Sequence, residues 1–74
     1  MSRIPSLTPR EIIAALKRAG FTEHHQSGSH LFLKHPATRH VFSVPMHNKE
    51  LKRPTMKAII KQSGLSEDEF RALL

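Results

Sequence analysis

The first apolar stretch of the chain has the spacing of an amphipathic helix. Its apolar side chains recur at intervals of three and four residues, which places them on one helical face. They are Ile12, Ile13, Leu16 and Ala19. Thr8 and Glu11 form a capping-box pattern, Pro9 fits the first helical position, and Leu7 stands where a hydrophobic staple begins. We therefore predict a helix that starts at Pro9 and is stopped by Gly20.

Two runs in the middle of the chain are typical of β-strands. Leu31–His35 and His40–Val44 flank the turn 36–39, so we predict an antiparallel hairpin about that turn. In this register the apolar side chains pair on one face: Leu31 with Val44, and Leu33 with Phe42. The opposite face carries His30, Phe32, Lys34, Val41 and Ser43.

A weaker strand precedes this hairpin. Phe21–Gln26 is joined to it by the turn Ser27–Ser29, but its alternation is poor because Glu23 and His25 share parity with Phe21. Either an edge position in the sheet or a β-bulge would explain that pattern.

The last third of the chain has a helical pattern. We expect Thr55 to cap a helix that ends at Gly64. Its apolar positions are Met56, Ala58, Ile59 and Ile60. Ser66 and Glu69 form a second capping box, which opens a short terminal helix. That helix is expected to carry Phe70, Leu73 and Leu74.

The predicted element order is α-β-β-β-α with a short extra helix at the C-terminal end. The simplest arrangement is an α+β fold in which helices cover one face of a three-stranded antiparallel sheet. We expect residues 1–74 to form one domain, with a thin core and a shallow site. The other sheet face is then open, and it carries His30.

The net charge points to a polyanionic partner. The formal charge is +6, and residues 1–66 alone carry eleven basic and three acidic side chains, or +8, because Glu67, Asp68 and Glu69 are clustered near the C-terminal end. Nucleic acid is the commonest partner of such a chain, although excess lysine can also serve solubility alone.

Several classes of protein are excluded or disfavoured by composition. The chain has no cysteine, which excludes disulfides and thiolate metal sites and favours a reducing cytosol. Met1–Pro5 lacks an apolar signal core, and no apolar run approaches the roughly 18 residues of a membrane span. We expect a soluble, cytoplasmic protein without a membrane partner.

Six histidines raise the question of a metal site. No pair has the H-x-x-x-H spacing of a helical zinc site. His30, His35 and His40 recur at an odd interval, which sends strand neighbours to opposite faces. Without cysteine and with few carboxylates to complete a ligand set, we expect no metal and no other cofactor.

His30 is the candidate for acid–base chemistry. It begins a strand directly after the Gly28-Ser29 turn, on the open face beside Phe32 and Lys34. Histidine titrates near neutral pH, so it can take a proton from a ribose 2′-hydroxyl or give one to a leaving 5′-oxygen. The alternative is an ordinary surface histidine.

Each of the other candidate residues has two possible roles. Lys34, together with Lys49, Lys52 and Arg53 of the predicted loop 45–53, would contact phosphates or be plain solvated charges. Phe32 would stack on a base or be covered by a partner protein. Ser29 would touch a phosphate or only shape its turn. Two further histidines, His24 and His47, are candidate helpers of His30. We expect a structural hydrogen bond for His25, and solvated side chains for His35 and His40.

The order and spacing of these motifs resemble one family. The matching pieces are Gly20-Phe21, His25–His30, Lys34-His35-Pro36, Val44-Pro45 with His47, Lys49 and Glu50-Leu51, and Thr55–Ser66. Together they resemble the HicA mRNA interferase toxins of HicAB type II toxin–antitoxin systems. One position departs from the family pattern, because Pro54 stands where glycine is usual before the helix, and proline has no amide donor.

The resemblance implies a double-stranded-RNA-binding-like fold and ribosome-independent cleavage of mRNA. It implies that His30 is the catalytic residue, with Gly28 and Ser29 as the rest of its Gly-Ser-His motif. It also implies a HicB-type antitoxin as partner, with a monomeric toxin when free and a hetero-oligomer when neutralised. Two alternatives remain: a non-catalytic RNA-binding module of the same fold, and a protein-interaction domain whose open sheet face is only the antitoxin surface.

Overall fold

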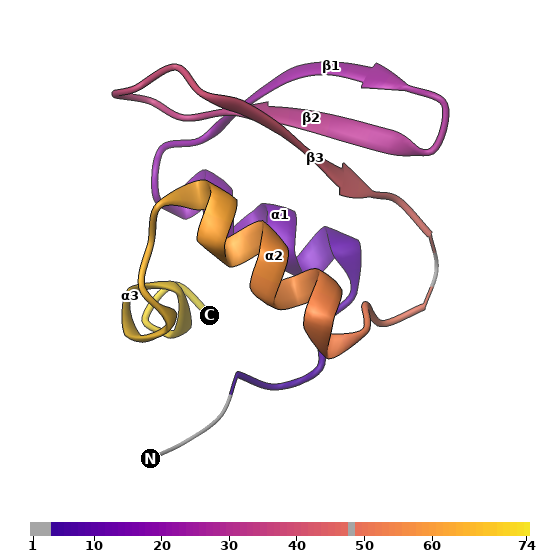
Figure 1. The fold of residues 1–74 in the computed structure, drawn as a ribbon, viewed down its shortest axis with the longest axis vertical. Coiled ribbons are helices and arrows are strands. Elements are labelled where there is room, and N and C mark those ends of the chain that lie inside the picture. Colours follow the sequence, from indigo (N-terminus) through magenta and orange to yellow (C-terminus); the bar gives the residue numbers. More distant parts are fainter. Residues whose placement is uncertain (1–3, 48) are drawn as a thin grey trace.

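The computed structural model describes residues 4–47 and 49–74. Its elements are α1 (Pro9–Arg18), β1 (Thr22–Ser27), β2 (His30–Lys34), β3 (Val41–Pro45), α2 (Arg53–Ser63) and α3 (Glu67–Arg71). The strands form one antiparallel sheet in the order β1-β2-β3, and α1 and α2 lie on the same side of it (Figure 1). The predicted α+β class and element order are confirmed. Met1–Arg3, in the predicted N-terminal segment, and Asn48, in the predicted loop, lie outside the described residues.

The start of α1 is fixed by its capping box. The Thr8 amide donates to the Glu11 carboxylate at 2.8 Å, and the Glu11 amide donates to the Thr8 hydroxyl at 3.3 Å. Leu7 and Ile12, the staple pair, are both buried. Gly20 follows the helix with φ +98, a left-handed conformation that suits glycine. The predicted first helix is confirmed at both ends.

The β2–β3 hairpin has the predicted register. Leu31 pairs with Val44 and Leu33 with Phe42, and all four side chains are buried against the helices. The opposite face is open and consists of exposed or half-buried side chains: His30, Phe32, Lys34, Val41 and Ser43.

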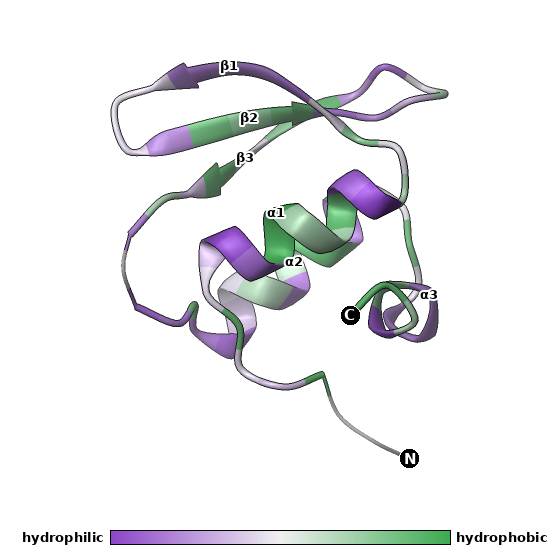
Figure 2. Cartoon of the chain, turned by 180° about the vertical axis from the view of Figure 1, so that it is seen from behind, coloured by the Kyte–Doolittle hydropathy of each residue, from purple (hydrophilic) through white to green (hydrophobic). Residues whose placement is uncertain are grey.

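Strand β1 is both an edge strand and a bulged one. Its register against β2 shifts between Glu23 and His25, so His24 is an extra residue, and all six residues of the strand are exposed. Figure 2 shows β1 as largely hydrophilic, in contrast to the hydrophobic stretches of β2 and β3. The poor alternation of this segment therefore has both of the predicted causes, an edge position and a β-bulge.

The boundaries of β1 differ from the prediction by one residue at each end. Phe21 precedes the strand because its amide bonds to the Leu16 carbonyl, and its ring packs edge-on against Phe42 in the core at 5.8 Å. Ser27 belongs to the strand, since it pairs with His30. The turn is therefore only two residues long.

The predicted start of α2 is wrong. The helix begins at Arg53, Lys52 is its N-cap, and no side chain caps it. The Met56 amide bonds to the Lys52 carbonyl at 3.0 Å, which places Thr55 inside the first turn. Pro54 lies in that turn too, where its fixed φ is compatible with a helix and its missing amide has no helical partner to lose. The predicted stop at Gly64 is confirmed by its φ of +82.

Helix α3 is opened by the predicted Ser66–Glu69 capping box, but it ends at Arg71, so Leu73 and Leu74 lie beyond it. Its Phe70 is fully buried. The Arg18 guanidinium donates to the Leu73 carbonyl at 2.6 Å and ties the end of α1 to the C-terminal residues. One core cluster includes side chains from every element except β1. Its buried members are Ile4, Leu7, Ile12, Ile13, Ala15, Leu16, Phe21, Leu31, Leu33, Phe42, Val44, Leu51, Met56, Ile59, Ile60 and Phe70.

Candidate active site

The Gly28-Ser29 turn sets the position of His30. Ser27 and His30 pair across β1 and β2, so the two intervening residues form a tight hairpin loop. Gly28 has φ +58 and Ser29 has no positive φ, the pattern of a type II′ turn, which calls for glycine at its first central position. The Ser29 carbonyl accepts a hydrogen bond from the Met46 amide just beyond β3. The turn is thus held by backbone bonds on both sides.

His30 is the first residue of β2 and is exposed on the open face. Its neighbours in the same cross-strand row are Ser27 on β1 and Pro45 on β3. Within residues 4–47 and 49–74, its imidazole makes no hydrogen bond, ion pair or ring contact. The ring is therefore accessible to a ligand from solvent, and no described side chain acts as its acid–base partner.

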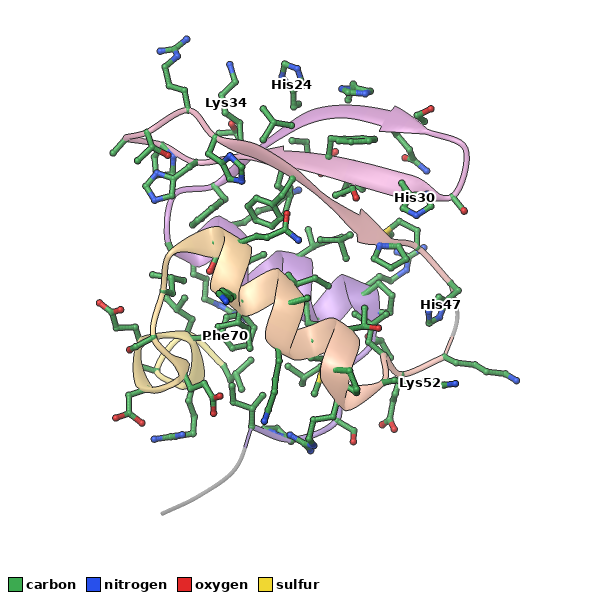
Figure 3. The ribbon with its side chains drawn as sticks, viewed as in Figure 1. His24, His30, Lys34, His47, Lys52 and Phe70 are labelled. Atoms are coloured by element: carbon green, nitrogen blue, oxygen red, sulfur yellow. The ribbon has the colours of Figure 1, made fainter. Side chains whose placement is uncertain are left out.

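The two candidate helpers lie in different places. His24 is the bulge residue of β1, and its ring contacts His25 edge-on at 5.1 Å rather than facing His30. His47 follows β3 closely, and its Nδ1 accepts from the Lys49 amide at 3.3 Å, which leaves Nε2 free. Figure 3 shows His30 and His47 on the right of the view, with His24 and Lys34 at the upper edge, further to the left. Of the two, His47 is the one on the same side as His30.

An open pocket of about 510 Å³ lies between the end of β3 and the start of α2. Its lining residues are Pro45, His47, Lys49, Glu50, Leu51, Lys52 and Thr55. Lys49 and Lys52 are exposed, and Glu50 is the one acidic residue among these lining residues. Because Pro45 is also the cross-strand partner of His30, the pocket adjoins the His30 end of the sheet. The structure thus places two of the predicted phosphate contacts, Lys49 and Lys52, in the lining of this pocket.

The other two predicted phosphate contacts are placed differently. The Arg53 guanidinium is half-buried and donates to the Ile4 carbonyl at 2.9 Å, so it holds the N-terminal segment against α2. Lys34 is at the far end of β2, four residues from His30, which is about 13 Å along an extended strand. It shares the open face with His30 but belongs to a different part of it.

The comparison with known protein families decides the identity of the chain. The family model described as the HicA toxin of bacterial toxin–antitoxin systems matches residues 9–65 of the 74. The chain belongs to the HicA toxin family. It is a toxin of a toxin–antitoxin system with a cognate antitoxin partner, in a family whose toxins are known as RNases. No curated protein matches it significantly.

This HicA toxin has features that the sequence did not reveal. Phe32 is half-buried, and the His25 ring stacks on it at 4.4 Å with an interplanar angle of 9°. His25 therefore makes a ring contact, and the hydrogen bond expected for it is not among its interactions in the described parts of the chain. The alternation of apolar residues in β2 correctly predicted that Phe32 lies on the open face. The position of the bulge decides which residue of β1 pairs with Phe32, and no sequence pattern indicated that position.

His35 was expected to be solvated, and this is wrong. It is half-buried, its ring contacts Phe21 at 5.0 Å, and its Nδ1 accepts from the Ala37 and Thr38 amides at 3.0 and 3.1 Å. His40 is exposed as expected. The backbone amides of a tight hairpin loop need acceptors, and the His35 ring supplies one.

Two features are absent from the described part of this HicA toxin. Among residues 4–47 and 49–74, no three or more His, Asp or Glu side chains gather as a metal ion would require. No helix in the same ranges is both long and apolar enough to cross a membrane.

Proposed function

We propose that this HicA toxin is an endoribonuclease that cleaves mRNA in the cytoplasm without a metal cofactor, with His30 as a general acid or base. One observation carries the proposal. His30, exposed at the start of β2, pairs across the sheet with Pro45, and Pro45 lines a pocket that also has two exposed lysines, Lys49 and Lys52. An accessible proton-transfer group beside cationic side chains is what cleavage of an RNA phosphodiester needs.

The reaction is an internal transesterification. The ribose 2′-oxygen attacks phosphorus, the bond from phosphorus to the 5′-oxygen breaks, and a 2′,3′-cyclic phosphate and a 5′-hydroxyl result. One proton leaves the 2′-hydroxyl and one is delivered to the 5′-oxygen. His30 performs one of these transfers, and His47 through its free Nε2, or a water molecule, performs the other.

The cationic side chains have separate roles in this proposal. Lys49 and Lys52 stabilise the negative charge that develops at the reacting phosphate. Lys34, about 13 Å along β2, holds a neighbouring phosphate of the same strand. Helix α3, which carries three of the six acidic residues, lies away from the sheet in both views of the ribbon (Figures 1 and 2). The open face is therefore the side on which electrostatic attraction for the RNA phosphates is least opposed by acidic residues.

A HicB-type antitoxin neutralises the toxin by covering this same face. The face presents the His30 imidazole without a described hydrogen bond, ion pair or ring contact, so a protein bound there would exclude RNA from it directly. RNA and the antitoxin would then compete for one surface of the toxin, and the free toxin would be a monomer.

The experiment is to incubate the purified toxin with RNA in excess chelator and to identify the ends of the products by mass spectrometry. We expect 2′,3′-cyclic phosphates and 5′-hydroxyls. Uncut RNA, or products with 3′-hydroxyl and 5′-phosphate ends, would overturn the proposed chemistry.

A non-catalytic RNA-binding module is the second candidate. The observation that favours it is the lack of an acid–base partner for His30 among the described residues. It predicts salt-dependent RNA binding without cutting by the wild-type protein, and binding that survives His30→Ala.

A further inference from the structure

The β-bulge in β1 selects which side chain lies on Phe32. Glu23 pairs with Leu33 and His25 with Phe32, so His24 is the inserted residue. Without the bulge, His24 would stand opposite Phe32. The insertion instead sets the His25 imidazole parallel to the Phe32 ring, at 4.4 Å and 9°.

The stacked pair forms an aromatic patch on the open face, and its His25 side chain is exposed to solvent. Phe32 is half-buried and lies against one face of the His25 ring, and the His24 ring contacts the exposed His25 edge-on at 5.1 Å. The three other phenylalanines are buried in the core, so Phe32 is the phenylalanine of the open face. A flat ring held in place by a second ring is a platform on which an unpaired base can stack, because it is already ordered before binding.

The platform lies in line with the proposed catalytic residue. Phe32 is two residues from His30 along β2, or about 6.6 Å, and Lys34 is two residues further. A single RNA strand lying along β2 would thus meet the acid–base group, then an aromatic surface, then a cation. That is the arrangement with which proteins bind unpaired nucleotides.

We infer that His25, supported by Phe32, is a base-stacking residue that positions an unpaired nucleotide next to the scissile phosphate. The inference rests on the proposed function, since it assigns a subsite of the same RNA-cleaving face. A base inside a duplex is stacked on its neighbours and has no free face for His25. The substrate class is therefore single-stranded RNA.

The test uses short single-stranded oligoribonucleotides with 2-aminopurine at successive positions, bound to the toxin carrying His30→Ala. The chain has no Trp or Tyr, so the probe is the dominant fluorophore. We expect quenching at one or two adjacent positions, its loss on adding His25→Ala, and its retention with His25→Phe. In the otherwise wild-type toxin, His25→Ala should raise KM roughly tenfold with little change in kcat, and His25→Phe should restore it.

His40→Ala is the matched control, because His40 is another exposed histidine with a ring contact, to Phe42 at 6.1 Å. It should leave KM unchanged. If the toxin cuts RNA but His25→Ala alters neither KM nor quenching, or duplex RNA is cut as fast as single strands, the platform is overturned and the nuclease stands. If His25→Ala weakens only binding of the purified antitoxin, the surface is a protein contact instead. If the wild type neither binds nor cuts RNA, the proposed function itself fails, and the platform fails with it.

Discussion

Ser27 and His30 face each other across the β1–β2 hairpin, with only Gly28 and Ser29 between them. The backbone of this turn, and its bond to Met46, therefore determine where His30 stands. The imidazole makes no hydrogen bond, ion pair or ring contact with a described side chain. The placement of the candidate catalytic group thus depends on main-chain geometry.

Substitution of Gly28 tests that dependence. Gly28→Ala should destabilise the protein by about 1–2 kcal/mol, because its φ of +58 is unfavourable for alanine. A Cβ there would meet nothing within 4 Å, so the cost is conformational and not steric. Ser29→Ala, in the same turn without a positive φ, should change stability by no more than about 0.5 kcal/mol. Urea unfolding measures both, and equal effects of the two variants would contradict the assigned turn.

The capping contacts predict a contrast between two threonines. Thr8→Ala removes the N-cap of α1 and should cost about 1 kcal/mol. Thr55→Ala removes no cap, since α2 begins at Arg53 with Lys52 at its N-cap, and should cost much less. Thermal unfolding followed by circular dichroism measures both. A larger loss of stability for Thr55→Ala than for Thr8→Ala would support the helix start predicted from sequence, with Thr55 as the N-cap.

The C-terminal helix lies beyond the matched family region, yet its Phe70 is fully buried. Phe70→Ala should destabilise the fold by about 3–5 kcal/mol, because it leaves a cavity in a small core. Leu74, which is 46% exposed, is the control, and Leu74→Ala should change stability by no more than about 0.5 kcal/mol. If both variants unfold like the wild type in urea, α3 is not part of the cooperative core.

The sequence determined the fold more fully than the site. The alternation of Leu31 and Leu33 against Phe42 and Val44 fixed the hairpin register and the open face, because one face had to be buried. The capping box at Thr8 fixed the first helix in the same way. These signals are local and have one structural solution.

The features that sequence missed depend on contacts between distant segments. Pro54 can stand at more than one position around a helix start. The half-buried Arg53 bonds to the Ile4 carbonyl, and the helix starts three residues earlier than expected. The poor alternation around His24 indicated a bulge but not which histidine would lie on Phe32. The Lys49–Lys52 pocket forms only where β3 and α2 approach each other.

Salt dependence tests the proposed role of that pocket. Lys52→Gln should weaken RNA binding and reduce the slope of log affinity against log salt by about 0.7 for a single strand, because one phosphate contact is lost. Lys61, exposed in the last turn of α2, is the matched lysine, and Lys61→Gln should leave the slope unchanged. Fluorescence anisotropy with labelled RNA at several salt concentrations gives both slopes. Equal slopes for the two variants would remove Lys52 from the RNA site.

The most direct test of the nuclease is single-turnover cleavage of RNA in chelator by the wild type, His30→Ala and His40→Ala. The rate for His30→Ala should fall at least about a hundredfold, the usual contribution of a general acid or base, with its unfolding temperature unchanged. His40→Ala, which removes an exposed histidine from the other hairpin, should cut at the wild-type rate. Cleavage by His30→Ala at the wild-type rate would contradict the assignment of His30 as the catalytic residue.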